Sequence, residues 1–281
     1  MSSAASKRGF VRAGTTLGPV TLVPEIRLYQ ASDPISLWQR IELAVARTGL
    51  DPPFWAFAWA GGQALARYLL DHPETVRGRQ VTDVASGSGL VAIAAARAGA
   101  AAVTAYDTDP LAVAAIGINA AANGVTVKAV CADVLDRDGP PAPGTGLVLA
   151  GDAFYERDLA AKVMRFLERS HARGAAVLAG DCGRAYLPRD LLTPLASYDV
   201  PGLGALEDTD IKRTTIWTPR HGLDNGSRAG PGDRGYQGLR ATPASVGTSG
   251  APPAWAASGR HSGQRTRPGV TNSRPSKNRP I

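Results

Sequence analysis

Two spacings of apolar residues alternate along the chain up to about residue 219. In five stretches, apolar residues recur every three or four positions or fill alanine-rich runs, which predicts helices with a buried face. These predicted helices cover residues 35–47, 63–70, 90–98, 110–122 and 159–170.

Short apolar runs rich in Val, Leu and Ala separate the predicted helices and indicate strands. They cover residues 20–28, 81–85, 103–107, 125–131, 147–150 and 175–179, with 199–205 and 214–218 as a closing pair. The run at 147–150 is wholly apolar, which is typical of a parallel strand buried on both faces. Strands and helices that alternate in this way predict an α/β fold with a doubly wound, mostly parallel sheet.

The composition changes sharply near residue 219. Residues 220–281 contain 10 Lys and Arg against 2 Asp and Glu, whereas residues 1–219 contain 21 against 22. The formal net charge of +7 therefore comes from the last segment, and the nearly neutral body gives no reason to expect nucleic acid as its partner. Gly, Pro and Ser make up 25 of the last 62 residues, so we expect 220–281 to be a disordered basic tail that binds nucleic acid weakly at most.

Several classes of protein are disfavoured by what the sequence lacks. Its two cysteines, Cys131 and Cys182, cannot form a disulfide framework, and no Cys/His cluster suggests a metal site. The sequence contains no run of about 18 apolar residues, so it gives no sign of a membrane-spanning helix. The first residues lack the apolar core of a signal peptide. We therefore expect a monomeric protein in the cytoplasm, with no metal and no membrane partner.

A glycine-rich turn, Asp83-Val-Ala-Ser-Gly-Ser-Gly89, joins a predicted strand to a predicted helix. Glycine allows the backbone to approach a ligand there and places the helix N-terminus against it. Asp107 ends the next strand, 20 residues after Gly87, where a carboxylate can accept hydrogen bonds from two ribose hydroxyls. Asp133 follows the third strand and is placed to meet an adenine edge. Each residue alone also fits a turn or a helix cap, but the set in this order predicts a nucleoside site.

The charges around this turn favour one nucleoside over the others. The turn carries no basic residue and no phosphate-binding lysine, and Asp83 stands at its entrance. A carboxylate at that position suits a cationic ligand with an amino group rather than a pyrophosphate. S-adenosylmethionine (SAM) has a sulfonium, an α-amino group and no phosphate, so we expect SAM as the cofactor.

The tract Pro53-Phe-Trp-Ala-Phe-Ala-Trp-Ala-Gly-Gly-Gln-Ala-Leu-Ala-Arg-Tyr-Leu-Leu-Asp71 resembles the region before the glycine loop in seven-β-strand protein-lysine methyltransferases. It is most similar to the electron transfer flavoprotein beta subunit lysine methyltransferase family. The resemblance covers about residues 10–219 and implies a Rossmann-like sheet of seven strands in a SAM-dependent methyltransferase domain at 51–219, with residues 1–50 as an extension packed on it. The other matching tracts are Val76-Arg-Gly78, Tyr106-Asp-Thr-Asp-Pro110, Gly151-Asp-Ala-Phe-Tyr155, Gly180-Asp-Cys-Gly-Arg184 and Thr214-Thr-Ile-Trp217.

The resemblance also implies which residues contact SAM. Two positions depart from the family's pattern: Ala85 replaces the first glycine of the loop, and Thr108 stands where an apolar residue often packs on adenine. The expected cofactor-binding residues are Trp59, Gly61, Asp83, Ser86, Gly87, Gly89, Asp107, Thr108 and Asp133.

Asp152 and Tyr155 follow the fourth strand of the predicted sheet, at the edge where such folds bind ligands. They are the expected catalytic residues. A carboxylate beside a lysine raises the pKa of the lysine, so Asp152 is expected to orient the amine and stabilise the developing ammonium rather than to deprotonate it. The alternative is that Asp152 caps the helix that begins near Arg157. Asp181 and Arg184 either shape the substrate entrance or form a surface turn.

The leading interpretation is a protein-lysine methyltransferase that acts on an electron transfer flavoprotein beta subunit. Tyr106-Asp-Thr-Asp-Pro110 and Asn123-Gly-Val125 also resemble ribosomal protein L11 methyltransferases, so a ribosomal protein or a small-molecule amine is the alternative substrate. Base methylation is disfavoured because Gly151-Asp-Ala-Phe-Tyr155 replaces the usual Asn/Asp-Pro-Pro-Tyr/Phe. An alternative of another class is a nonenzymatic SAM-binding protein that its basic tail tethers to RNA.

Overall fold

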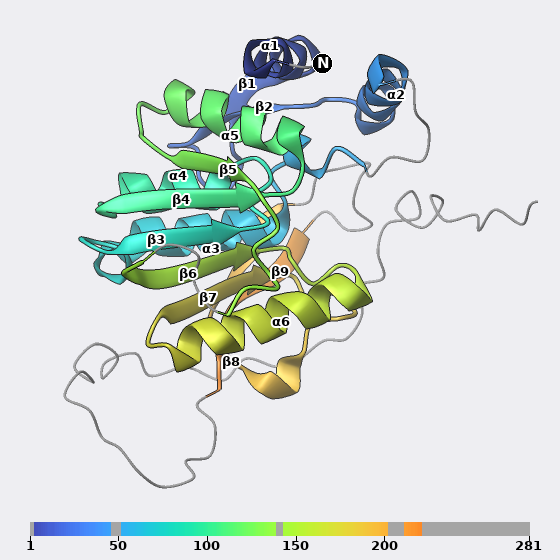
Figure 1. The fold of residues 1–281 in the computed structure, drawn as a ribbon. Coiled ribbons are helices and arrows are strands. Elements are labelled where there is room, and N and C mark those ends of the chain that lie inside the picture. Colours follow the sequence, from blue (N-terminus) through green and yellow to red (C-terminus); the bar gives the residue numbers. More distant parts are fainter. Residues whose placement is uncertain (1–2, 46–51, 139–142, 202–210, 221–281) are drawn as a thin grey trace, which may run out of the picture.

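A seven-stranded sheet runs through the centre of the computed structural model, which describes residues 3–45, 52–138, 143–201 and 211–220 (Figure 1). The strand order is β5-β4-β3-β6-β7-β9-β8. Neighbours from β5 to β7 are parallel, and β9 runs antiparallel to both β7 and β8. The predicted α/β fold with a mostly parallel seven-stranded sheet is confirmed. The strands are β3 (Gln80–Val84), β4 (Ala102–Asp107), β5 (Lys128–Cys131), β6 (Thr145–Gly151), β7 (Ala176–Asp181), β8 (Leu192–Pro201) and β9 (Ile211–Pro219).

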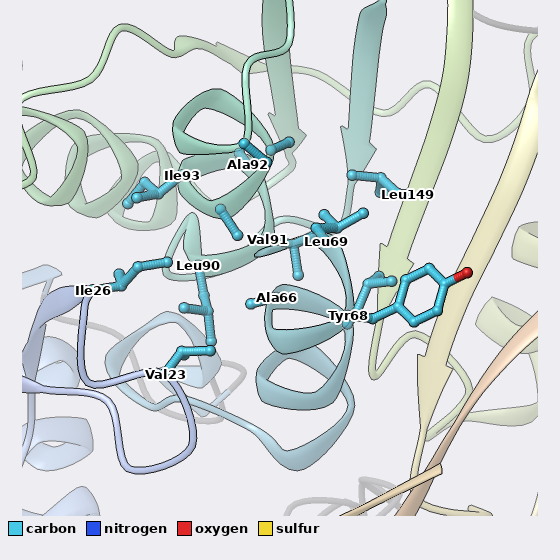
Figure 2. Packing of buried hydrophobic residues seen from close by; sticks show 14 of the residues in the cluster. Val23, Ile26, Ala66, Tyr68, Leu69, Leu90, Val91, Ala92, Ile93 and Leu149 are labelled. Carbon is cyan, nitrogen blue, oxygen red and sulfur yellow. The ribbon is translucent and has the colours of Figure 1, made fainter. Parts of the chain in front are cut away.

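Helices cover both faces of this sheet, and successive side chains of β6 pack alternately against the helices on one face and on the other. Leu147 and Leu149 belong to the apolar cluster that includes α3 and α4, whereas Val148 and Ala150 belong to the cluster that includes α6 (Figures 1 and 2). Successive side chains of a strand point to opposite faces, so a strand covered on both sides is apolar throughout. The helices are α3 (Ala60–Asp71), α4 (Leu90–Arg97), α5 (Pro110–Ala122) and α6 (Arg157–Ala172), with short 3-10 turns η1 (Phe54–Ala56), η2 (Pro73–Thr75) and η3 (Arg189–Leu191).

The N-terminal segment packs on α5. Its Tyr29 and Arg27 amides donate to the side chains of Asn119 and Asn123 at 2.8 and 2.9 Å. Val11 joins α5 residues in a third apolar cluster. The elements of this segment are α1 (Ala4–Gly14), β1 (Thr16–Pro19), β2 (Arg27–Gln30) and α2 (Pro34–Val45).

The predicted strand at 20–28 is wrong. β1 and β2 form an antiparallel hairpin, and residues 20–26 are mostly the turn between them. The Val20 amide donates to the Ile26 carbonyl at 3.0 Å and closes this turn. Pro24 lies inside the stretch and has no amide to donate, which disfavours a continuous strand there.

Other predicted boundaries shift as well. The strand predicted at 125–131 begins only at Lys128, the helix predicted at 159–170 spans Arg157–Ala172, and the strand predicted at 214–218 spans Ile211–Pro219. α3 begins at Ala60 rather than at 63, so that Gly61 and Gly62 lie in its first turn. β8 begins at Leu192 instead of 199, and residues 202–205 of that prediction lie outside the described residues. Of the predicted tail, Arg220 donates its amide to the Leu191 carbonyl at 2.9 Å. Residues 221–281 lie outside the described part of the chain.

Gly61 and Gly180 meet where α3 crosses β7. A Cβ on Gly61 would lie 2.2 Å from the Gly180 carbonyl oxygen, and a Cβ on Gly180 would lie 2.2 Å from the Gly61 carbonyl oxygen. Both clashes involve backbone atoms, which cannot rotate away. The close approach of α3 to the sheet therefore requires glycine at both positions.

We expect Gly61→Ala to lower the free energy of unfolding by roughly 2 to 3 kcal/mol, because α3 has to move away from β7. Gly117→Ala is the matched control: Gly117 is exposed on α5 and a Cβ there would meet nothing within 4 Å. That change is expected to stabilise by about 0.5 to 1 kcal/mol through helix propensity. Urea unfolding of both variants measures the difference. Equal effects would contradict the assigned packing.

Within the described ranges, no helix is long and apolar enough to cross a membrane. The same residues include no group of three or more His, Cys, Asp or Glu side chains arranged to hold a metal ion.

Candidate active site

A cavity of about 840 Å³ opens at the carboxyl ends of β3, β4, β6 and β7. Its size lies in the range typical of small-molecule sites. It brings together nine of the eleven residues predicted from the sequence, although they come from segments up to about a hundred positions apart. These are Trp59, Asp83, Ser86, Gly87, Asp107, Thr108, Asp133, Asp152 and Tyr155.

Gly61 and Gly89 are not among the residues that line the cavity. Gly61 lies against β7, as described above. Gly89 adopts a φ of +83° as the N-cap of α4, and a Cβ there would come within 3.2 Å of Ile116. Both glycines shape the cavity wall through packing. Their predicted contact with SAM stays a prediction.

The glycine loop turns with left-handed backbone at Ala85, Gly87 and Gly89, whose φ angles are +50°, +55° and +83°. Ala85 adopts this conformation at a steric cost that glycine would avoid. The Gly87 amide donates to Asp107 Oδ2 at 2.8 Å, which ties the loop to the end of β4.

Asp107, the last residue of β4, lines the cavity beside the glycine loop. Its Oδ1 accepts the Asp109 amide at 2.9 Å, and burial raises the pKa of the carboxyl. A carboxylate offers about four lone-pair sites, so Asp107 retains acceptor capacity for ribose hydroxyls. Thr108 and Asp133 are exposed at the rim, and Asp133 Oδ1 accepts the Leu135 amide at 3.0 Å.

Asp83 is buried beside the loop. Ser86 Oγ donates to its Oδ2 at 2.5 Å, whereas its Oδ1 is buried without a hydrogen-bond partner in the described structure. Burial raises the pKa of Asp83 to about 7. A buried polar atom without a partner is costly, and an amino group of a bound ligand would satisfy it.

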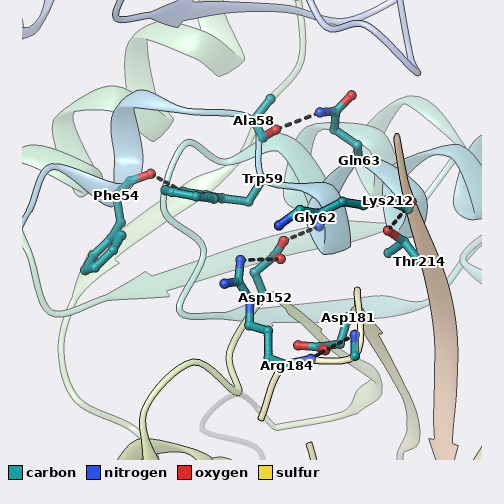
Figure 3. A network of polar contacts seen from close by, with 11 residues as sticks. Phe54, Ala58, Trp59, Gly62, Gln63, Asp152, Asp181, Arg184, Lys212 and Thr214 are labelled. Carbon is teal, nitrogen blue, oxygen red and sulfur yellow. Dashed lines mark hydrogen bonds and ion pairs between the residues drawn. The ribbon is translucent and has the colours of Figure 1, made fainter. Parts of the chain in front are cut away.

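Asp152 occupies the other end of the cavity, immediately after β6. It is 8% exposed and has a φ of +55°. The Gly62 amide donates to its Oδ2 at 2.6 Å, and Arg184 Nη2 donates to its Oδ1 at 3.1 Å (Figure 3). The carboxylate therefore lies at the positive end of α3.

Asp152 does not cap α6. The N-cap of that helix is Glu156, and no side chain makes a capping hydrogen bond there. The alternative that the sequence left open for Asp152 is therefore excluded. Its bond to Gly62, in the first turn of α3, was not anticipated.

Aromatic side chains form the wall next to Asp152. The Trp59 indole donates to the Phe54 carbonyl at 2.8 Å, and the Phe54 and Tyr155 rings lie 5.1 Å apart. The Arg184 guanidinium lies 5.7 Å from the centre of the Trp59 ring, within the range of a cation–π contact. Phe54 and Gly62 line the cavity as well, although the site predicted from the sequence does not include them. Arg184, for which the sequence left open a substrate entrance or a surface turn, also lines the cavity. These three residues lie in the tracts 53–62 and 180–184, which already resemble the family in the sequence and could have indicated them.

Carboxylates dominate the lining. Asp83, Asp107, Asp109, Asp133, Asp152, Glu156 and Asp158 are present against Lys162 and Arg184. Such a lining disfavours phosphate and favours a cation. The unsatisfied Asp83 oxygen fits an amino group, and Asp107 fits a ribose, so the residues present are compatible with SAM.

The order of the parallel strands changes direction between β3 and β6, and the acidic cavity lies at the carboxyl ends of these strands. This fold and this cavity define a SAM-dependent methyltransferase of class I. The family model "Ribosomal protein L11 methyltransferase (PrmA)" matches residues 63–146. A ribosomal protein L11 methylase structure from Lactobacillus delbrueckii is 23% identical over 57% of this chain and 79% of that chain, with a TM-score of 0.39.

The chain belongs to the electron transfer flavoprotein beta subunit lysine methyltransferase family. The member from Xenopus laevis is 36% identical over 224 residues, which are 77% of this chain and 88% of the relative. The member from Rattus norvegicus is 36% identical over 70% of this chain and 77% of the relative. The member from Homo sapiens is 34% identical over 70% and 75%. The predicted family, the methyltransferase class and the SAM cofactor are confirmed.

Proposed function

We propose that this chain transfers methyl groups from SAM to lysine side chains of an electron transfer flavoprotein beta subunit. The observation that carries the proposal is the buried Asp152 carboxylate at one end of the cavity, beside an aromatic wall. An ammonium is stabilised by such a carboxylate, and the wall suits the apolar stem of lysine. The names of the family members support the same substrate.

We assign the predicted cofactor residues to two ends of SAM. Asp107, Thr108 and Asp133 would hold the adenosine. On the methionine side, the unpartnered oxygen of Asp83 would accept from the α-amino group, and Trp59, Ser86 and Gly87 would line the chain. Gly61 and Gly89 would act by fixing the backbone around these contacts.

When bound, SAM supplies a sulfonium methyl group whose carbon–sulfur bond breaks as the lysine nitrogen's lone pair forms the new carbon–nitrogen bond, leaving S-adenosylhomocysteine and a methylammonium. Asp152 faces the position where the positive charge arrives, and its hydrogen bonds to Gly62 and Arg184 hold it there. Tyr155 and Phe54 pack along the lysine stem. Alignment of the amine by this set is the main contribution of the protein.

The test uses the purified full-length chain with methyl-labelled SAM and purified electron transfer flavoprotein from the same organism. Label in the beta subunit, located on lysine by mass spectrometry, is the expected result. Ribosomal protein L11, total RNA and a small-molecule amine fraction form the parallel arms. Label confined to any of these would overturn the substrate while leaving the methyltransferase class intact. The monomeric state and the cytoplasmic location stay predictions.

A further inference from the structure

Arg184 is placed between the two groups that define the amine end of the cavity. Its Nη2 lies 3.1 Å from Asp152 Oδ1, and its guanidinium lies 5.7 Å from the Trp59 ring centre. The Arg184 and Asp152 side chains are 13% and 8% exposed. Figure 3 shows the Arg184 side chain extending from the loop that follows β7, with its guanidinium beside the Asp152 carboxylate. The ion pair is therefore largely removed from water.

Other charged groups face this pair from β7, from β9 and from the loop after β6. Asp181 is fully buried; its Oδ1 accepts the Gly183 and Arg184 amides at 2.7 and 2.8 Å, and its Oδ2 has no partner among the described residues. Burial and the neighbouring Asp152 raise the pKa of Asp181 to about 6. Among the residues that the structure describes, the other titratable groups on these elements include Cys182, whose thiol has a pKa raised by burial, together with Lys212, Tyr155 and Glu156.

A lysine must lose a proton before it accepts a methyl group, which costs roughly 4 kcal/mol at neutral pH for an ordinary lysine. A lone carboxylate next to the amine would stabilise the ammonium and increase this cost. The guanidinium of Arg184 has the opposite effect on the same amine. Burial lowers and the Asp152 carboxylate raises the pKa of Arg184; the net direction is upward, so its charge persists over the whole working range.

We infer that Arg184 is a positioning residue: it holds the Asp152 carboxylate in place and offsets its charge, so that the methyl-accepting amine loses its proton at lower pH than it would beside Asp152 alone. The inference rests on the proposed function. Asp152 keeps acceptor sites for the amine, because each of its oxygens accepts one bond in the described structure and a carboxylate oxygen can accept two.

The test is the pH profile of kcat/KM for lysine methylation, recorded from pH 6.5 to 10.5 on full-length variants. Arg184→Gln removes the charge, and the midpoint of the rising limb is expected to move up by roughly one to two pH units. Arg184→Lys restores the charge without the planar guanidinium, and its midpoint is expected to stay near that of the unaltered chain. A fall in rate that is uniform across pH would overturn the inference.

Asp181→Asn provides an independent arm with the opposite sign. Asparagine keeps an oxygen for the Gly183 and Arg184 amides but removes a negative charge near the amine. Its midpoint is expected to move to lower pH. Arg189→Gln is the matched control, since it removes an exposed positive charge at the start of η3, close to the same loop. Its midpoint should not move.

The two levels of failure are separable. If the unaltered chain methylates no lysine, the proposed function fails. If it methylates lysine and the Arg184→Gln and Asp181→Asn midpoints stay unchanged, only the role of Arg184 fails. Should Arg184→Gln not fold, as judged by thermal melting with SAM present, the direction of the Asp181→Asn shift decides alone.

Discussion

Replacing Asp152 with asparagine is expected to lower kcat for lysine methylation about 100- to 1,000-fold. We propose that the carboxylate lies where the positive charge of the product forms, and removal of one such preorganised group commonly has an effect of this size. Label transfer from SAM to the beta subunit measures the loss. SAM affinity, measured by calorimetry, should change only severalfold, because the predicted cofactor-binding residues are unaltered.

Asparagine is the appropriate substitution because of the backbone at this position. Asp152 has a φ of +55°, which Asn tolerates and which strains alanine. Asn also keeps an oxygen for the Gly62 amide. Asp190→Asn, at an exposed position on η3, is the matched control and should leave kcat unchanged. Retention of a third or more of the activity by Asp152→Asn would contradict the assigned role.

Replacing Asp83 with asparagine is expected to stabilise the SAM-free protein by about 2 to 4 kcal/mol at pH 8 and to weaken SAM binding at least tenfold. The gain arises because the buried carboxyl, with a pKa raised to about 7, is forced to ionise at pH 8 without compensation. SAM affinity falls because asparagine lacks the negative charge of Asp83, which we propose binds the α-amino group of SAM. One substitution would thus act on stability and binding in opposite directions.

The sign of the pH dependence follows from the raised pKa. The folded carboxyl retains its proton to higher pH than the unfolded one, so its contribution to stability is lost as pH rises from about 4 to 7. The stability gap between Asp83→Asn and the unaltered chain should therefore narrow when urea unfolding is repeated at pH 5. A gap that widens at low pH would exclude Asp83 as the source.

The sequence was most informative where local chemistry sets the structure. Asp109 and Pro110 begin α5 as an N-cap and a first helical residue, and Asn123-Gly124 ends it, so the predicted and observed bounds agree. The loop from Asp83 to Gly89 was found in the same way. Its residues and Asp107 belong to adjacent strand ends, and parallel strands bring such ends together.

The boundaries that failed depend on distant contacts. Gly61 and Gly62 look like loop residues because glycine has low helix propensity. Inside α3, however, Gly61 packs against Gly180, where a larger residue would clash. Gly62 packs against Gly151. Pro194 argues against a strand, but β8 lies at the edge of the sheet, where one missing amide is tolerated.

The weakest point of sequence reasoning was the link between Asp152 and Arg184. The two residues are 32 positions apart, and nothing in the spacing of either tract specifies an ion pair. Their meeting depends on β6 and β7 being parallel neighbours with Gly151 opposite Gly180. The chemistry of the amine end could therefore be inferred only after the register of the sheet was known.

The two outer strands of the sheet, β5 and β8, are the ones at which a strand of another protein could pair. β5 has four residues and begins with the exposed Lys128. β8 contains Pro194 and Pro201, and its pairing with β9 is irregular between Pro194 and Ala196. β5 is short and carries an exposed charge, and β8 lacks amide donors at its prolines. Both features disfavour the pairing of a strand from another chain by backbone hydrogen bonds. Within the described part of the chain, this sheet is protected at both borders against the edge-to-edge growth that leads to aggregation.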